Sequence, residues 1–205
     1  MIELVNYDKE HLNKNVKYIS GTDEAGRGPL AGPVCVASVI MPLDHDIVVG
    51  ANDSKKLTEK KREELYDKII NSAISYSIVF VDEDRIDEIN ILNATKEGMI
   101  KSLNSLNIKP DLALIDAVKL NTDLNIMPLI HGDAISYNIA CASILAKVSR
   151  DRYICEIADN YPEYNFKKNK GYGTKEHIEA LKKYGACKIH RETYLKNFKV
   201  SKYEK

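Results

Sequence analysis

Two adjacent acids at the end of an apolar run constrain the fold of this chain more than any other feature. The segment "ISGTDEAGRGPLAGPV" (19–34) places Asp23 and Glu24 side by side and continues mainly in small, turn-forming residues. Neighbouring carboxylates repel each other, and a buried carboxylate is costly unless it is paired or binds a cation. The pair therefore predicts a strand that ends at a polar site, where something must offset the repulsion.

The order of the remaining segments predicts an α/β domain with a mixed sheet. Three strand-like segments come first, the first two paired across the glycine-rich turn, and helices then alternate with strands. Thr58 and Thr174 are expected to cap the N-termini of two helices, and Gly185 to end the last one. The expected strands are 16–24, 33–41, 74–81, 111–118 and 126–130, the expected helices are 58–73, 91–106, 134–159 and 174–185, and the expected loops are 53–57 and 161–173.

Two further acids stand where other strands are expected to end. Asp116 lies in the apolar stretch "LALIDA", and Asp133 follows the last expected strand in "HGD". If these strands neighbour the first one, four carboxylates meet at one edge of the sheet, and they can stay ionised together only beside cations. Oxygen-only ligands favour Mg²⁺ or Mn²⁺, and two such ions ~3.5–4 Å apart can promote phosphodiester hydrolysis. The alternative for Asp133 is the N-cap of the helix that follows it.

The glycine-rich turn has two rival interpretations. "GRGPLA" (26–31) formally matches the dinucleotide-binding fingerprint, but that fingerprint must open a helix, and here the chain runs through prolines into a β-branched strand. We therefore reject it. Gly26, Arg27 and Gly28 instead predict a backbone that approaches a ligand closely, and a contact with a 2′-hydroxyl would distinguish RNA from DNA. A plain tight turn is the alternative, and it leaves Arg27 unexplained.

Two other stretches suit a nucleic-acid partner. Lys55 in "NDSKKL" is a candidate phosphate contact, with an exposed helix lead-in as the alternative. Tyr172 stands between two glycines among lysines in "KKNKGYGTKEH" (167–177), a pattern typical of stacking on a base or sugar. His177 is expected at the surface or as a cap in the first turn of its helix, rather than in proton transfer.

Charge is distributed unevenly along the chain, although the formal net charge is zero. Residues 1–166 hold 18 Lys and Arg against 26 Asp and Glu, whereas residues 167–205 hold 12 against 4. A basic end on an acidic body favours a polyanionic partner beside a metal centre. A solvated lysine-rich tail is the alternative.

Length and composition predict one globular domain over residues 1–205. No run reaches the ~18 apolar residues that span a bilayer. The polar start lacks the apolar core of a signal peptide, so we expect a cytoplasmic protein with no membrane partner. The four cysteines contain no C-x-x-C pair, which favours free thiols over a zinc site.

These blocks together resemble the ribonuclease HII family, the type 2 ribonucleases H. The matching segments, in order, are "GTDEAGRGPLAGPV", "NDSKKL", "LALIDAV", "HGDAISYNIACASILAKVSRDR" and "NKGYGTKEHIEALKKYG", within about residues 17–195. The resemblance implies a ribonuclease H-like fold, with a mixed five-stranded sheet flanked by helices. It also implies cleavage of the RNA strand in RNA–DNA hybrids and incision 5′ of ribonucleotides embedded in duplex DNA, leaving 3′-hydroxyl and 5′-phosphate ends.

The resemblance also implies roles for individual residues. The four metal ligands of the family correspond to Asp23, Glu24, Asp116 and Asp133, its Gly-Arg-Gly motif to Gly26, Arg27 and Gly28, its phosphate-contacting lysine to Lys55 and its stacking tyrosine to Tyr172. Two Mg²⁺ or Mn²⁺ ions and a monomeric state are expected. We expect no extra N-terminal substrate-binding domain of the ribonuclease HIII kind, and with the Gly-Arg-Gly motif this favours type HII. The sequence has "HGD" where many members have Lys-Gly-Asp and shows no convincing clamp-binding motif, and we expect a short C-terminal segment with a reduced grip on DNA.

Two rival functions remain open at this level. A junction resolvase or exonuclease of the ribonuclease H-like group also uses clustered acids but needs no reader of the 2′-hydroxyl. A non-catalytic hybrid-binding protein would bind the same nucleic acid without cutting it.

Overall fold

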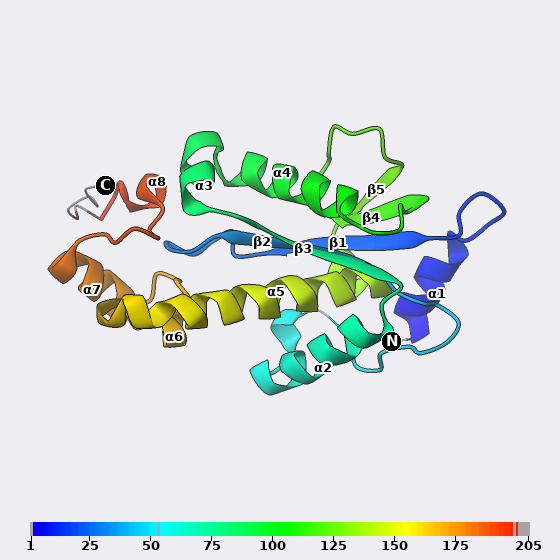
Figure 1. The fold of residues 1–205 in the computed structure, drawn as a ribbon, viewed down its shortest axis with the longest axis horizontal. Helices are drawn as coiled ribbons and strands as arrows, with labels where there is room; N and C mark the ends of the chain where they lie inside the picture. The colour runs from blue at the N-terminus through cyan, green and yellow to red at the C-terminus, as the bar shows by residue number, and fades with distance from the viewer. Residues whose placement is uncertain (1, 53, 199, 201–205) are drawn as a thin grey trace.

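The strands form one mixed five-stranded sheet, as expected from the sequence, and their order is β3-β2-β1-β4-β5. The structure is a computed structural model that describes residues 2–52, 54–198 and 200. Figure 1 shows the sheet edge-on between two layers of helices. The strands are β1 (Ile19–Ala25), β2 (Val34–Ile40), β3 (Ser75–Val81), β4 (Leu112–Asp116) and β5 (Ile126–Leu129).

Strand direction brings the expected acidic strand ends to one edge of the sheet. Strand β1 is antiparallel to β2, with Asp23 opposite Ala37, and parallel to β4, with Thr22 opposite Ile115. Strand β4 is in turn parallel to β5, where Asp116 lies opposite Leu129. The carboxyl ends of β1, β4 and β5 therefore open at the same edge, because parallel neighbours end on the same side.

Helix α5 (Tyr137–Ile157) covers one face of the sheet together with α2, and α3 and α4 cover the other (Figure 1). Its close approach to β1 depends on Gly21, where an added Cβ would lie 2.1 Å from the backbone carbonyl carbon of Asn138. Most of α5 is buried, including Ala140, Cys141 and Ala142. The small residues of this helix thus allow the close packing that their composition predicts.

Most helix boundaries agree with the sequence within a few residues. Thr58 and Thr174 cap their helices by accepting hydrogen bonds from Lys61 N and His177 N. The helix expected from 134 begins instead at Tyr137, because Ser136 is its N-cap. The α-helices are α1 (Ile2–Glu10), α2 (Glu59–Ser72), α3 (Glu83–Ile89), α4 (Ile91–Asn104), α5, α6 (Phe166–Asn169), α7 (Lys175–Tyr184) and α8 (Glu192–Leu195).

Several short elements depart from the expectations. Helices α1, α3 and α8 are not anticipated by the sequence patterns. The expected loop 161–173 contains a 3₁₀ helix at Pro162–Tyr164 and then α6. The expected loop 53–57 forms a 3₁₀ helix at Ser54–Lys56, and its residue 53 lies outside the described residues.

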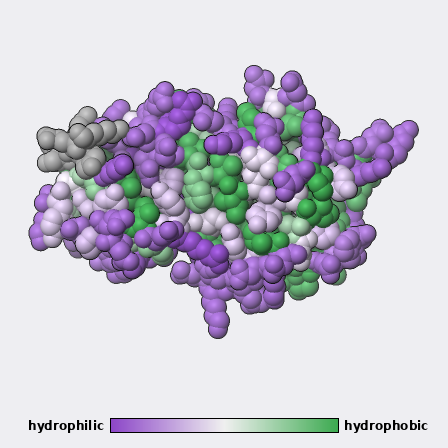
Figure 2. All heavy atoms as spheres, viewed as in Figure 1, coloured by the Kyte–Doolittle hydropathy of each residue, from purple (hydrophilic) through white to green (hydrophobic). Residues whose placement is uncertain are grey.

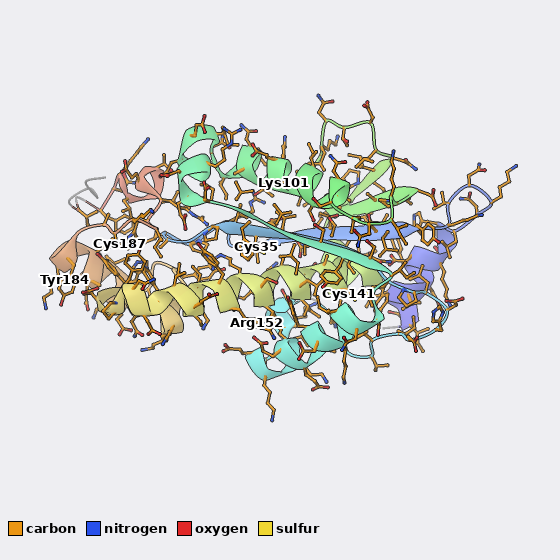
Figure 3. The ribbon with its side chains drawn as sticks, viewed as in Figure 1. Cys35, Lys101, Cys141, Arg152, Tyr184 and Cys187 are labelled. Atoms are coloured by element: carbon orange, nitrogen blue, oxygen red, sulfur yellow. The ribbon has the colours of Figure 1, made fainter. Side chains whose placement is uncertain are left out.

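Charged and polar side chains cover most of the face seen in Figure 2, with hydrophobic residues along its middle. Cys35, Cys141 and Cys187 are buried, Cys155 is half-buried, and all four are free thiols. The three buried cysteines lie well apart, on β2, on α5 and beyond α7 (Figure 3). Within the described residues, no helix combines the length and apolar character needed to span a bilayer.

Candidate active site

A cleft of about 200 Å³ opens at the carboxyl ends of β1 and β4. It brings together seven of the nine predicted site residues, whereas Asp133 and Gly28 are not among the residues that line it. The residues lining it are Asp23, Glu24, Ala25, Gly26, Arg27, Ser54, Lys55, Asp116, Ser143, Lys147 and Tyr172. The cleft thus unites acids from two strands with cations and an aromatic ring from four other segments.

Asp23 and Glu24 form the buried, strongly perturbed part of this cleft. Asp23 is only 5% exposed, and its Oδ1 accepts a hydrogen bond of 2.7 Å from the backbone N–H of Glu24. Burial, with added repulsion from Glu24 and Asp116, holds the pKa of Asp23 well above its ordinary value. Burial also raises the pKa of Glu24, although Arg27 opposes this shift. The folded chain therefore keeps these carboxyls where their negative charge is unfavourable without a cation.

Asp116 and Asp133 are joined through the backbone that follows β5. The N–H of Gly132 donates to Asp116 Oδ1 across 2.7 Å, which sets the turn carrying Asp133 against the end of β4. Asp133 is buried, and its Oδ2 lies 3.9 Å from Nζ of Lys55, a residue lining the cleft. Asp133 does not cap α5, because Ser136 does so. The alternative of a simple N-cap for Asp133 is therefore wrong.

The donor set at the cleft suits a hard divalent cation. All four predicted ligands are carboxylates, and Oε2 of Glu24 is buried without a hydrogen-bond partner. Among the described residues, no group of three Asp, Glu, His or Cys side chains is placed so that it could hold a metal ion by itself. Mg²⁺ and Mn²⁺ usually retain water molecules and take further ligands from substrate phosphate. Side-chain cations lie beside two of the acids: Arg27 is 3.4 Å from Glu24, and Lys55 is near Asp133.

The Gly-Arg-Gly segment is held from behind by Arg191. This side chain is fully buried and donates to the carbonyl of Gly26 at 2.6 Å, of Arg27 at 2.9 Å and of Gly32 at 2.7 Å. One guanidinium therefore fixes three carbonyls of a single turn, which a planar fork of five donors can do. Arg27, by contrast, projects toward solvent and Glu24.

A second buried arginine, Arg150 of α5, also packs against this glycine-rich stretch. Its guanidinium donates to the carbonyls of Ala31, Pro33 and Lys170 at 2.9–3.0 Å. Gly26 adopts a φ of +97° directly against this side chain. The glycine-rich segment 26–33, called the shelf below, is thus held along the cleft by two buried arginines.

Tyr172 lines the cleft beside this shelf. Its side chain is 41% exposed, and the position that a Cβ would take at Gly28 lies 3.9 Å from Cε1 of its ring. The charged groups of Lys147 and Arg150 lie 5.7 and 5.8 Å from the ring centroid. The ring therefore stands partly exposed beside the Gly-Arg-Gly segment, supported by cations from α5.

The sequence motifs do not single out four residues that shape this site. Ser143 hydrogen bonds to Asp23 and Lys147 lines the cleft, whereas Arg150 and Arg191 hold the shelf. No sequence pattern indicates a role in the site for any of the four. For the lysine and the two arginines, this is because Lys and Arg in polar stretches normally indicate an exposed, charged surface. His177 lies in the first turn of its helix as expected, but the expectation that its side chain is at the surface is wrong, because it is fully buried.

Comparison with known proteins identifies the family. The family model described as Ribonuclease HII matches residues 20–198. A ribonuclease HII from Caldicellulosiruptor bescii is 56% identical over 191 residues, covering 93% of this chain and 92% of its own length.

Two solved structures have the same fold. The ribonuclease H2 of Pyrococcus horikoshii OT3 superposes with a TM-score of 0.74 at 30% identity, covering 86% of this chain and 93% of its own. The ribonuclease HII of Archaeoglobus fulgidus, solved in complex with PCNA, gives 0.71 at 25% identity, covering 89% and 97%. With the acidic cleft at the expected strand ends, these matches show that the chain belongs to the ribonuclease HII family and is a metal-dependent endoribonuclease of the kind that cuts RNA–DNA hybrids.

Proposed function

We propose that this protein cuts the RNA strand of RNA–DNA hybrids and also incises duplex DNA on the 5′ side of a single embedded ribonucleotide. The products would carry 3′-hydroxyl and 5′-phosphate ends. The observation that carries the proposal is the placement of a half-exposed tyrosine ring beside the Gly-Arg-Gly segment, in the same cleft as the acids. A nuclease that does not distinguish ribose from deoxyribose needs no tyrosine ring beside such a segment.

The acids would hold two divalent ions, Mg²⁺ or Mn²⁺. Asp23, Glu24, Asp116 and Asp133 supply only oxygen ligands, and the partnerless Oε2 of Glu24 offers one directly. When bound, such ions provide an activated water and stabilise the departing 3′ oxygen. The protein's own contribution would be to hold Asp23, Glu24 and Asp116 in one cleft that leaves room for the scissile phosphate.

The shelf and the ring would read the sugar. The carbonyls of Gly26 and Arg27 already accept hydrogen bonds from Arg191. We therefore propose that the backbone N–H groups of Gly26, Arg27 and Gly28 contact the ribose and its phosphate. Tyr172 would stack on the sugar or base beside the 2′-hydroxyl. Together these groups would locate the step from RNA to DNA.

The cations around the cleft would bind the backbone of the nucleic acid. Lys55 is largely exposed and lies next to Asp133, so it can meet a phosphate close to the metal ligands. The basic stretch 167–205 would add affinity that is independent of sequence and falls with salt. We further propose that the chain acts as a single catalytic domain and as a monomer.

Cleavage mapping tests the proposal. Three labelled duplexes of the same sequence are compared in Mg²⁺ and in Mn²⁺: one all-DNA, one with a single ribonucleotide and one with a full RNA strand. We expect cutting of the hybrid and one cut 5′ of the single ribonucleotide, with none in the all-DNA duplex. Equal cutting of the all-DNA duplex would reject a reader of the 2′-hydroxyl, and a bound but uncut hybrid would indicate a binding protein.

A further inference from the structure

Two buried histidines lie directly behind Tyr172 and outside the acidic cleft. His177 comes from the first turn of α7, and His190 from the segment between α7 and α8. Their exposed fractions are 0% and 4%, and their Nε2 atoms lie 3.0 Å apart. Cys187, labelled in Figure 3, lies in the same segment as His190.

The hydrogen-bond partners determine which nitrogen of each ring carries the proton. The Tyr172 carbonyl can only accept, so His177 Nδ1, at 2.9 Å, is the donor. His177 Nε2 is then the acceptor in a neutral ring, and His190 Nε2 must donate to it. His190 Nδ1 accepts in turn from the N–H of Cys187 at 2.9 Å. The result is one directed chain from Cys187 through both imidazoles to the carbonyl of Tyr172.

The surroundings favour this neutral arrangement. Aromatic rings enclose the pair, with Phe166 5.3 Å from His177 and Tyr164 5.0 Å from His190 between ring centroids. Burial lowers the pKa of His190 to about 3 and also lowers the pKa of His177. A pair of neutral rings, one donating and one accepting, is the state that leaves no buried charge.

The carbonyl at the end of this chain belongs to the turn that presents the tyrosine ring. It also accepts from the N–H of Thr174 at 2.8 Å. One residue earlier, the carbonyl of Gly171 accepts from Leu30 N at 2.8 Å, which docks the turn on the shelf. The backbone at Tyr172 is thus fixed on one side by the shelf and on the other by His177.

We infer that His177, oriented by His190, is a positioning residue for Tyr172 and sets the preference of the enzyme for the RNA-to-DNA step. The imidazole pair touches no substrate. It holds the turn so that the ring stays beside Gly28 in the cleft. This inference rests on the proposed function, in which Tyr172 reads the sugar.

The preference is measured as the ratio of kcat/KM on the single-ribonucleotide duplex to kcat/KM on the full hybrid. Tyr172→Ala defines the ratio without the ring. His177→Leu removes the donor to the Tyr172 carbonyl, and we expect the ratio to fall about tenfold, equivalent to ~1.4 kcal/mol. His177→Asn keeps an N–H donor at the Nδ1 position, and we expect it to restore the ratio to within about threefold of wild type.

A double variant separates positioning from a general loss of structure. If His177 acts through Tyr172, then adding His177→Leu to Tyr172→Ala changes the ratio no further, because the two residues share one effect. A purely structural role would lower kcat/KM on both substrates equally and leave the ratio unchanged in His177→Leu. That result would overturn the inference.

Imidazole ¹⁵N spectra of the unmodified protein give a readout independent of activity and of any variant that fails to fold. We expect His177 protonated on Nδ1 and His190 on Nε2 at pH 7. The opposite tautomer at His177 cannot donate to the Tyr172 carbonyl and would also overturn the inference. The wild-type enzyme is measured before any histidine variant. If it cuts hybrids but shows no preference for the RNA-to-DNA step, the role proposed for Tyr172 is itself wrong.

Discussion

Gly26 and Arg150 are in closer contact than any side chain at position 26 would permit. A Cβ at Gly26 would lie 2.0 Å from Nε of Arg150 and 2.3 Å from its Cδ. The φ of +97° at Gly26 is also a conformation that L-residues rarely adopt. The Arg150 side chain is fully buried and bonded to three carbonyls, so it cannot move aside without breaking them.

Gly26→Ala should therefore destabilise the protein and disturb the shelf. We expect a loss of about 2–4 kcal/mol in unfolding free energy, measured by urea denaturation. Gly28→Ala is the matched control, because its Cβ would meet only the Tyr172 ring at 3.9 Å. That variant should stay within about 0.5 kcal/mol of wild type. Equal stability of the two variants would contradict the packing described for Arg150.

Arg191→Lys should damage the protein despite retaining the positive charge. A lysine ammonium cannot span the carbonyls of Gly26, Arg27 and Gly32, so buried acceptors lose their donors. We expect a loss of about 2–4 kcal/mol in stability and a matching fall in hybrid cleavage.

The control for that change is Arg152→Lys, at an arginine that is exposed on α5 and pairs with Glu63 at the surface. It should cost less than about 1 kcal/mol. If the two arginine variants were equally stable, Arg191 would not be the support of the shelf.

His190 should make stability fall as the solution becomes acidic. Its pKa is about 3 in the folded protein and about 6.5 in the unfolded chain, so the unfolded state binds more protons between these values. The unfolding free energy should therefore decrease as pH falls below 6.5, by up to ~1.4 kcal/mol per pH unit. His190→Asn is expected to be less stable at pH 7 but to have a flatter profile between pH 6.5 and 5.

The surface variant His45→Asn removes an imidazole from an exposed site and serves as the comparison. Parallel profiles for wild type and His190→Asn would show that the buried ring does not titrate as its environment requires. Chemical denaturation at each pH, rather than activity, is the measurement, because metal binding to carboxylates also varies with pH.

Divalent ions should stabilise the protein through Asp116. We expect Mg²⁺ or Mn²⁺ at about ten times its dissociation constant to add ~1.4 kcal/mol to wild-type stability, seen as a rise in Tm. Asp116→Asn retains an oxygen to accept from Gly132 N–H, so it should fold. Its metal-dependent rise in Tm should shrink, and its cleavage rate should fall about a thousandfold or more.

Asp123→Asn is the control. It makes the same substitution at an exposed acid that lies beyond β4. Its Tm response and its cleavage rate should match wild type. A wild-type rate in Asp116→Asn would remove Asp116 from the proposed metal site.

The sheet and its acidic edge are predictable because their signals are local. The apolar run of β4 ends at Asp116, and Asp23 and Glu24 lie near the carboxyl end of β1. What the sequence pattern does not indicate is the parallel pairing of these two strands. Helix starts at Thr58 and Thr174 were equally clear, since each threonine caps its own turn.

The supports of the site were not predictable from such signals. Arg150 and Arg191 donate mostly to carbonyls more than a hundred positions away in the sequence, and no local sequence pattern indicates those partners. His177 lies in a polar helix start, and its burial depends on rings brought by the segment 161–173, which the sequence suggests is only a loop. Helix α1 lies in a short stretch of mixed polarity, and Leu4 and Val5 bury its apolar side in the core.

The bond from Arg191 to Gly26 joins positions 165 residues apart. During synthesis the four predicted acids leave the ribosome before residue 191, so a growing chain carries them before it has the arginine that holds its glycine-rich turn. A chain whose translation stopped before residue 191 would contain the acids but lack the three hydrogen bonds that Arg191 donates to this turn.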